Sequence, residues 1–157
     1  MASRDLNDLK PLMLQRIILF ERQLEEHGLK NFCRSCVLRS QAEHDALWMR
    51  GRYPLNVVNA AYRKVWLAPI TAEENKRPVT WVLTSRHTPR PGETKVDAVD
   101  YFQLVKGRAS YDLKVDSDFD NIPDWHEFVK IAQMCGLEAG GAWQKKDYPH
   151  VQWKDDL

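Results

Sequence analysis

The sequence has 157 residues, of which 43% are hydrophobic and 29% charged, the balance of one ordinary globular domain spanning residues 1–157. The net charge is +1 and the two signs are interspersed, so no single-sign surface favours nucleic acid or a membrane as a partner. The polar residues 1–10 lack the apolar core of a signal peptide, and no apolar run is long enough for membrane insertion. We therefore expect a monomer that is made in the cytoplasm.

The first third of the chain predicts a helix, a strand and a second helix. The first helix should end near Gly28, and its apolar stripe has a spacing of three or four residues: Leu6, Leu9, Met13, Ile17, Phe20 and Leu24. A strand is expected over residues 31–38. Ser40 and Glu43 then match a capping box, which starts a helix over about residues 41–49. Arg39 would lie at this strand–helix junction, a place that commonly carries functional side chains.

The rest of the chain predicts a weak helix, several strands and one further helix. The expected strands are residues 79–84, 96–105, 111–115 and 150–153, with the third paired to the second through a turn at 106–108. The expected helices are residues 54–66 and a segment from Pro123 to Gly136. This order is neither a βαβ series nor all-β, so we predict an α+β fold in which helices pack on a small antiparallel sheet.

The three cysteines are an odd number, which argues against a disulfide framework. Cys33 and Cys36 form a CxxC, a spacing shared by redox pairs and zinc knuckles. Residues three apart on a strand point to opposite faces, however, and the sequence has no second CxxC. We interpret both as ordinary strand residues.

The alternating acids Asp116, Asp118 and Asp120 are similar to the start of a calcium loop. Asn121 replaces the glycine that such a loop needs, and Pro123 and Trp125 interrupt the pattern before the glutamate at its twelfth position. The interpretation is a solvated loop that leads into a helix. Three histidines on predicted helices are interpreted as surface residues: His27, His44 and His126.

The other two histidines have neighbours that suggest chemistry. His87 follows a strand-like run, and His150 lies in a turn rich in glycine and proline. Asp100 lies in a strand that looks buried, where a carboxylate is costly unless it is paired or binds a metal. Two histidines and one carboxylate that leave one coordination position open form a common catalytic zinc site. Because these three residues lie far apart in the sequence, they are one of several possible ligand sets. Asp147 could take a proton from water, and Arg39 could hold a substrate carboxylate or an oxyanion.

The same residues carry a family likeness. Segments 85–87 and 98–102 match the two ends of the motif S-x-H-x-x-G-x-A-x-D, and segments 140–143 and 147–152 match a closing run of G-G-x-W and D-x-P-H-x-Q. The chain thereby resembles the zinc peptidases of bacterial peptidoglycan. This family includes D-Ala-D-Ala carboxypeptidases and dipeptidases, and phage endolysins that act as L-alanyl-D-glutamate endopeptidases. The likeness to the endolysin branch is the closer one.

This resemblance implies a fold, an activity and a site. The fold would be the small single α+β domain of these zinc DD-peptidase-like enzymes. Zn²⁺ would be bound by His87, Asp100 and His150, with Asp147 as the catalytic acid/base and Arg39 as the clamp on substrate or transition state. The substrate would be the stem peptides of peptidoglycan, cut at L-Ala–D-Glu. The alternatives are a D-Ala-D-Ala carboxypeptidase or dipeptidase, and a non-catalytic wall-binding or phage structural relative. The implied setting is phage or prophage lysis, with action on the cell wall after release.

The chain departs from the motif in one respect. Twelve residues separate His87 from Asp100, whereas the motif has six, and we interpret residues 88–95 as an inserted loop. The insertion makes Asp97 a rival ligand. We prefer Asp100 because its neighbours match the end of the motif. The two aspartates are also an odd number of positions apart, so only one can face the site from a regular strand.

Overall fold

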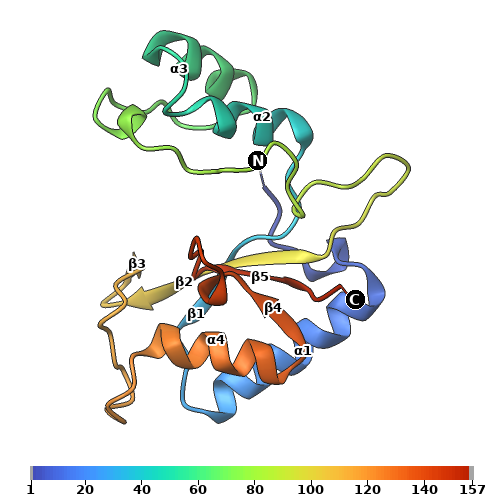
Figure 1. The fold of residues 1–157 in the computed structure, drawn as a ribbon, viewed down its shortest axis with the longest axis vertical. Coiled ribbons are helices and arrows are strands. Elements are labelled where there is room, and N and C mark those ends of the chain that lie inside the picture. Colours follow the sequence, from blue (N-terminus) through green and yellow to red (C-terminus); the bar gives the residue numbers. More distant parts are fainter. Residues whose placement is uncertain (1, 156–157) are drawn as a thin grey trace.

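Within residues 2–155, which the computed structural model describes, four α-helices accompany a five-stranded antiparallel sheet (Figure 1). The helices are α1 (Pro11–Glu26), α2 (Gln41–Met49), α3 (Leu55–Lys64) and α4 (Asp124–Met134). The strands are β1 (Phe32–Cys36), β2 (Ala98–Val105), β3 (Arg108–Ser110), β4 (Leu137–Ala139) and β5 (His150–Trp153). The predicted α+β class is confirmed.

The sheet places β2 at its centre. Its order is β1-β2-β5-β4, and β3 pairs with the far end of β2. Helices α1 and α4 cover one face, whereas α2 and α3 lie beyond the opposite face with the long connection that precedes β2 (Figure 1). Any β2 or β5 side chain that does not enter the α1–α4 core therefore points towards the side of α2.

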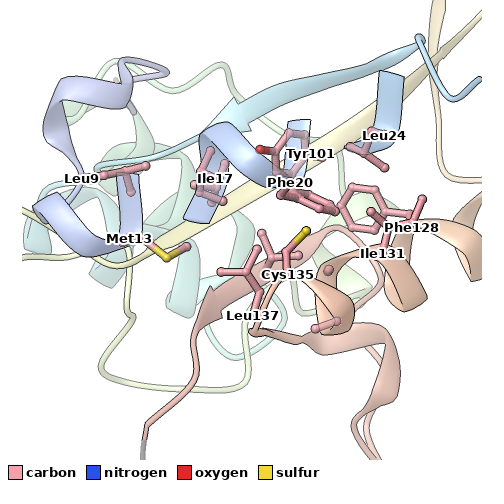
Figure 2. Packing of buried hydrophobic residues seen from close by; sticks show 14 of the residues in the cluster. Leu9, Met13, Ile17, Phe20, Leu24, Tyr101, Phe128, Ile131, Cys135 and Leu137 are labelled. Carbon is pink, nitrogen blue, oxygen red and sulfur yellow. The ribbon is translucent and has the colours of Figure 1, made fainter. Parts of the chain in front are cut away.

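The main core fills the space between the sheet and the helices α1 and α4. The predicted stripe of α1 supplies Met13, Ile17, Phe20 and Leu24, all at most 3% exposed, and Phe20 packs edge-on against Phe128 of α4 (Figure 2). From β2, Val99 and Tyr101 enter the same core. Because alternate strand residues point to opposite faces, Asp100 between them must face the other side.

The predicted starts of the first two helices have different outcomes. The first helix begins later than its apolar stripe, because Pro11 occupies its first turn and disfavours helical geometry in the residue before it; Leu6 instead begins a 3₁₀ turn, Leu6–Asp8. The predicted cap of α2 is confirmed, since the Ser40 hydroxyl accepts a 3.1 Å hydrogen bond from the Glu43 N–H.

The strand expected at residues 79–84 is wrong, because this segment pairs with no strand among the described residues. Side chains satisfy its backbone instead. The Thr80 carbonyl accepts from Arg52 Nη2 at 3.0 Å, and the Val82 carbonyl is 2.8 Å from His44 Nε2. His44 is therefore buried at 1% exposure, which corrects its interpretation as a surface residue, whereas His27 and His126 are exposed as expected.

The strand expected at 111–115 is also displaced. The chain reverses in two residues, Lys106 and Gly107, both with positive φ, and Val105 then pairs directly with Arg108. Such a turn matches the natural twist of a hairpin, so the returning strand is β3 and ends at Ser110. No helix in the described part of the chain is long and apolar enough to cross a membrane.

Candidate metal and catalytic site

The pairing of β2 with β5 brings two of the predicted ligands together. Asp100 and His150 are directly opposite each other in the antiparallel register, on the face away from α1 and α4. His150 Nδ1 lies 2.9 Å from Asp100 Oδ1. The neighbouring residue Val151 is fully buried in the core, as the strand alternation requires.

His87 reaches the same point from the long connection that precedes β2. Its carbonyl accepts a 2.7 Å hydrogen bond from the Arg39 N–H, and its Nδ1 lies 2.9 Å from the Val37 carbonyl. These two bonds hold the imidazole against the chain that leaves β1. Its Nε2 then lies 3.1 Å from Asp100 Oδ2 and 3.2 Å from His150 Nδ1. All three predicted ligands are thus brought together.

The three donors fit a tetrahedral metal such as Zn²⁺. Ligands held at about 2.0–2.1 Å from zinc are about 3.3 Å apart along the edges of a tetrahedron. In each imidazole the other ring nitrogen faces an acceptor. His87 Nδ1 faces the Val37 carbonyl, and His150 Nε2 lies 2.8 Å from Gln152 Oε1. A ring whose far nitrogen is N–H presents a lone pair on the near nitrogen, which is the tautomer that binds a metal.

Without a cation between them, the side chains of His87, His150 and Asp100 share a proton. Burial lowers the pKa of His87, but the adjacent Asp100 carboxylate overrides burial and raises that pKa to about 10. Burial likewise opposes the charge of Asp100, and the two imidazoles hold its pKa well below the usual range. A cation between them must displace this proton, so metal binding at this site should strengthen as the pH rises.

The rival ligand Asp97 points elsewhere. Its carboxylate takes hydrogen bonds from Arg86 Nε at 2.8 Å and from Arg86 Nη2 at 3.1 Å. Arg86 also reaches Asp155 at 2.8 Å. Asp97 is therefore committed to an ion-pair network, whereas Asp100 lies between the imidazoles.

Cys36 forms a second possible donor set with His87 and Asp100. Its thiol lies 3.6 Å from His87 Nδ1, the nitrogen that Val37 O already engages, so Cys36 lies behind the imidazole rather than among the three converging donors. Cys33 and Cys36 are both free and both lie in β1, in agreement with their interpretation as ordinary strand residues.

Asp147 lies in the closing loop, residues 143–149. Desolvation and the charge of Asp100 raise the pKa of its carboxyl, and the two imidazoles oppose that shift. Its backbone N–H donates to the Gly140 carbonyl at 2.9 Å. A side chain at Gly140 would collide with the Asp147 carbonyl, so glycine is needed for the loop to pack this closely. Asp147 is exposed, and an exposed carboxyl with a raised pKa suits proton transfer.

Trp143 borders the donors, whereas the Arg39 side chain lies beside Cys36, behind the His87 imidazole. The Arg39 side chain is 16% exposed and lies beside Cys36, with Nη2 at 3.5 Å from the thiol and Nε at 4.0 Å from Glu43. The Trp143 ring centroid lies 5.3 Å from that of His150, so the tryptophan forms part of the site's border.

The sequence analysis gave no role to the residues that orient the ligands, although Gln152 ends the matched closing run. Gln152 accepts from His150 and donates to Glu138 at 3.2 Å, and Glu138 also accepts from Trp143 Nε1 at 2.8 Å. The available signal was the spacing of His150 and Gln152, because residues two apart on a strand share a face. The support of His87 by the Val37 carbonyl has no signal in the sequence.

The acidic loop gathers two further sets of carboxylates that could hold a cation, Asp116 with Asp118 and Asp124, and Asp118 with Asp120 and Glu127. Backbone N–H groups of residues 120 and 121 already donate to the Asp116 carboxylate. These sets are separate from the three converging donors.

No protein-family model and no curated protein matches this sequence. Among solved structures, the crystal structure of the L-Ala D-Glu endopeptidase ChiX of Serratia marcescens is similar, with a TM-score of 0.54 and 19% sequence identity. The alignment covers 98% of this chain and 89% of that chain. At this identity the likeness establishes a shared fold across almost the whole chain.

Proposed function

We propose that this protein is a zinc-dependent peptidase of bacterial peptidoglycan that cuts the L-Ala–D-Glu bond of the stem peptide. The observation that carries the proposal is the convergence of His87 Nε2, His150 Nδ1 and the Asp100 carboxylate, in which the closest atoms of each pair lie 2.9–3.2 Å apart. The fold shared with an L-Ala D-Glu endopeptidase supports the choice of bond. The motifs around these residues support the same class.

The chain's own residues can perform the remaining parts of a hydrolysis. A bound zinc ion supplies Lewis acidity and a water of lowered pKa. The Asp147 carboxyl, whose pKa is raised by desolvation and by Asp100, accepts the proton of the attacking water and returns it to the leaving amine. From the family resemblance we assign to Arg39 the binding of a peptide carboxylate or of the developing oxyanion.

The first test is digestion of purified peptidoglycan with and without a zinc chelator, followed by mass spectrometry of the released fragments. Chelator-sensitive cleavage at L-Ala–D-Glu supports the proposal. Loss of a terminal D-Ala would retain the metal site and assign the enzyme to the carboxypeptidase alternative. If the zinc-loaded protein released no fragment from any wall type, a binding or structural role would replace catalysis.

A matched pair of aspartate variants tests the ligand assignment. Asp100→Asn should lose stoichiometric zinc and turnover, because it removes the carboxylate between the two imidazoles. Asp97→Asn removes the same charge three residues earlier but weakens only the Arg86 network, so it should retain zinc and lose thermal stability. The opposite pattern would make Asp97 the ligand. His150→Ala should abolish both zinc binding and activity, and full activity in that variant would exclude the proposed site.

A further inference from the structure

The inserted loop lines a cavity of about 580 Å³. The other walls come from Lys10 before α1, Gln41 at the start of α2 and Asp97 before β2. Arg86 and Thr88, the two chain neighbours of His87, also line this cavity. The cavity therefore adjoins the segment that carries His87. The inserted loop, residues 88–95, is the part of this segment that the family motif lacks.

The cavity has more basic than acidic side chains. Its basic residues are Lys10, Arg86, Arg90 and Lys95, and its acidic residues are Glu93 and Asp97. Both acids are already paired, Glu93 with Lys10 at 2.9 Å and Asp97 with Arg86 at 2.8 Å. Asp155 also pairs with Arg86 and interacts electrostatically with Arg90, so the four basic and three acidic groups leave one positive charge, which Arg90 and Lys95 carry between them.

Arg90 and Lys95 retain donors for an anion. Arg90 is exposed, and its guanidinium makes no hydrogen bond or ion pair with residues 2–155. The Lys95 ammonium donates to the Asn7 carbonyl at 2.8 Å and has further N–H groups available. Guanidinium and ammonium groups together are well suited to a carboxylate.

The structure around Arg90 limits its freedom. Pro89 and Pro91 flank it, and each proline ring fixes one backbone dihedral. Behind the loop, Arg86 is held by Asp97 and by Asp155 Oδ2 at 2.8 Å. A cation held on a restrained loop loses less conformational entropy when it binds an anion.

We propose that this cavity is a substrate subsite, in which Arg90 and Lys95 bind a free carboxylate of an acidic wall peptide, apart from the three converging donors. The inference rests on the proposed function, which supplies the peptide. It adds a recognition element outside the three converging donors, and it makes Arg90 and Lys95 specificity-determining residues. The subsite would discriminate peptides with a free carboxylate from peptides in which that carboxylate is amidated.

The test uses the full chain and two synthetic stem peptides that differ only in whether a free carboxylate of the peptide is amidated. For Arg90→Gln and Lys95→Gln we expect KM for the acidic peptide to rise about three- to tenfold, with kcat unchanged, because the contacts are partly exposed. The difference should shrink as salt is added. Neither variant should change KM for the amidated peptide. Arg108→Gln is the matched control, since Arg108 is an exposed arginine on β3 outside the cavity.

The outcomes separate the subsite from the proposed function. If the wild type cuts both peptides and Arg90→Gln and Lys95→Gln leave both KM values unchanged, the subsite is excluded and the peptidase remains. If the wild type cuts neither peptide, calorimetric binding of the two peptides decides. Tighter binding of the acidic peptide that is lost in Arg90→Gln and kept in Arg108→Gln would retain the subsite without catalysis. Equal binding of the two peptides would overturn it.

Discussion

Replacement of Gln152 by leucine tests how the metal site is supported. The Gln152 side chain is the acceptor for His150 Nε2–H at 2.8 Å and is itself tied to Glu138 at 3.2 Å. Leucine has a similar volume but cannot accept a hydrogen bond. The imidazole then loses the partner that keeps the proton on Nε2, and the tautomer with a proton on Nδ1 cannot bind a metal through that atom.

Loss of such a supporting partner typically weakens metal affinity by about 10- to 100-fold, which corresponds to about 1.4–2.7 kcal/mol. Zinc affinity can be measured by competition with a chromogenic chelator, and the stability of the metal-free protein by thermal unfolding. Gln103→Leu is a matched control: Gln103 is a fully buried glutamine on β2 that hydrogen-bonds Asp124. It should lower stability and leave zinc affinity unchanged. Wild-type affinity in Gln152→Leu, or equal losses in the two variants, would refute the reasoning.

Three other changes test separate parts of the structure. Gly140→Ala should displace the Asp147 loop and lower kcat more than tenfold with zinc retained, because the new methyl group meets the Asp147 carbonyl; unchanged turnover would contradict this. Desolvation and neighbouring aspartates raise the pKa of Glu127 in the folded protein to about 7. The protonated carboxyl therefore contributes its full share of stability below the pKa of Glu127 in the unfolded chain, and this share is lost as the pH rises through 7. Glu127→Gln should therefore raise the melting temperature at about pH 8 more than at about pH 5, and equal shifts would reject the charge argument. Lys145→Met removes an ammonium that lies 3.2 Å from the centre of the Trp81 ring, and should lower the free energy of unfolding by about 0.5–1 kcal/mol in urea titrations; an unchanged value would show that the contact does not stabilise the fold.

Local patterns in the sequence were sufficient for several elements. The spacing of apolar residues identified α1, and the serine before Gln41 identified the start of α2, because periodicity and capping depend on residues only a few positions apart. The same holds for the strand alternation that turns Asp100 away from the core. The loop prediction for residues 88–95 is also confirmed, and its two prolines and one glycine explain why.

Where the local pattern and the long-range contacts disagree, the contacts decided. Residues 79–84 have the composition of a strand, but side chains from the α2 region occupy their carbonyls. His44 was assigned to the surface because helical position alone does not say which face is covered. Both outcomes depend on a segment more than 25 residues away in sequence, as the hydrogen bonds between residues 44 and 82 and between 52 and 80 show.

The candidate site divides in the same way. The sequence alone determined which residue types could bind a metal. It also favoured Asp100 over Asp97, because the residues around Asp100 match the end of the motif and because residues an odd number of positions apart on a strand point to opposite faces. Only the tertiary structure brought His87 to Asp100 across a twelve-residue connection, through the Arg39 N–H and the Val37 carbonyl. Backbone groups are the same in every residue, so a contact made by a main-chain carbonyl leaves no mark in the sequence. Strand register and loop packing, rather than spacing along the chain, therefore decide which side chains meet.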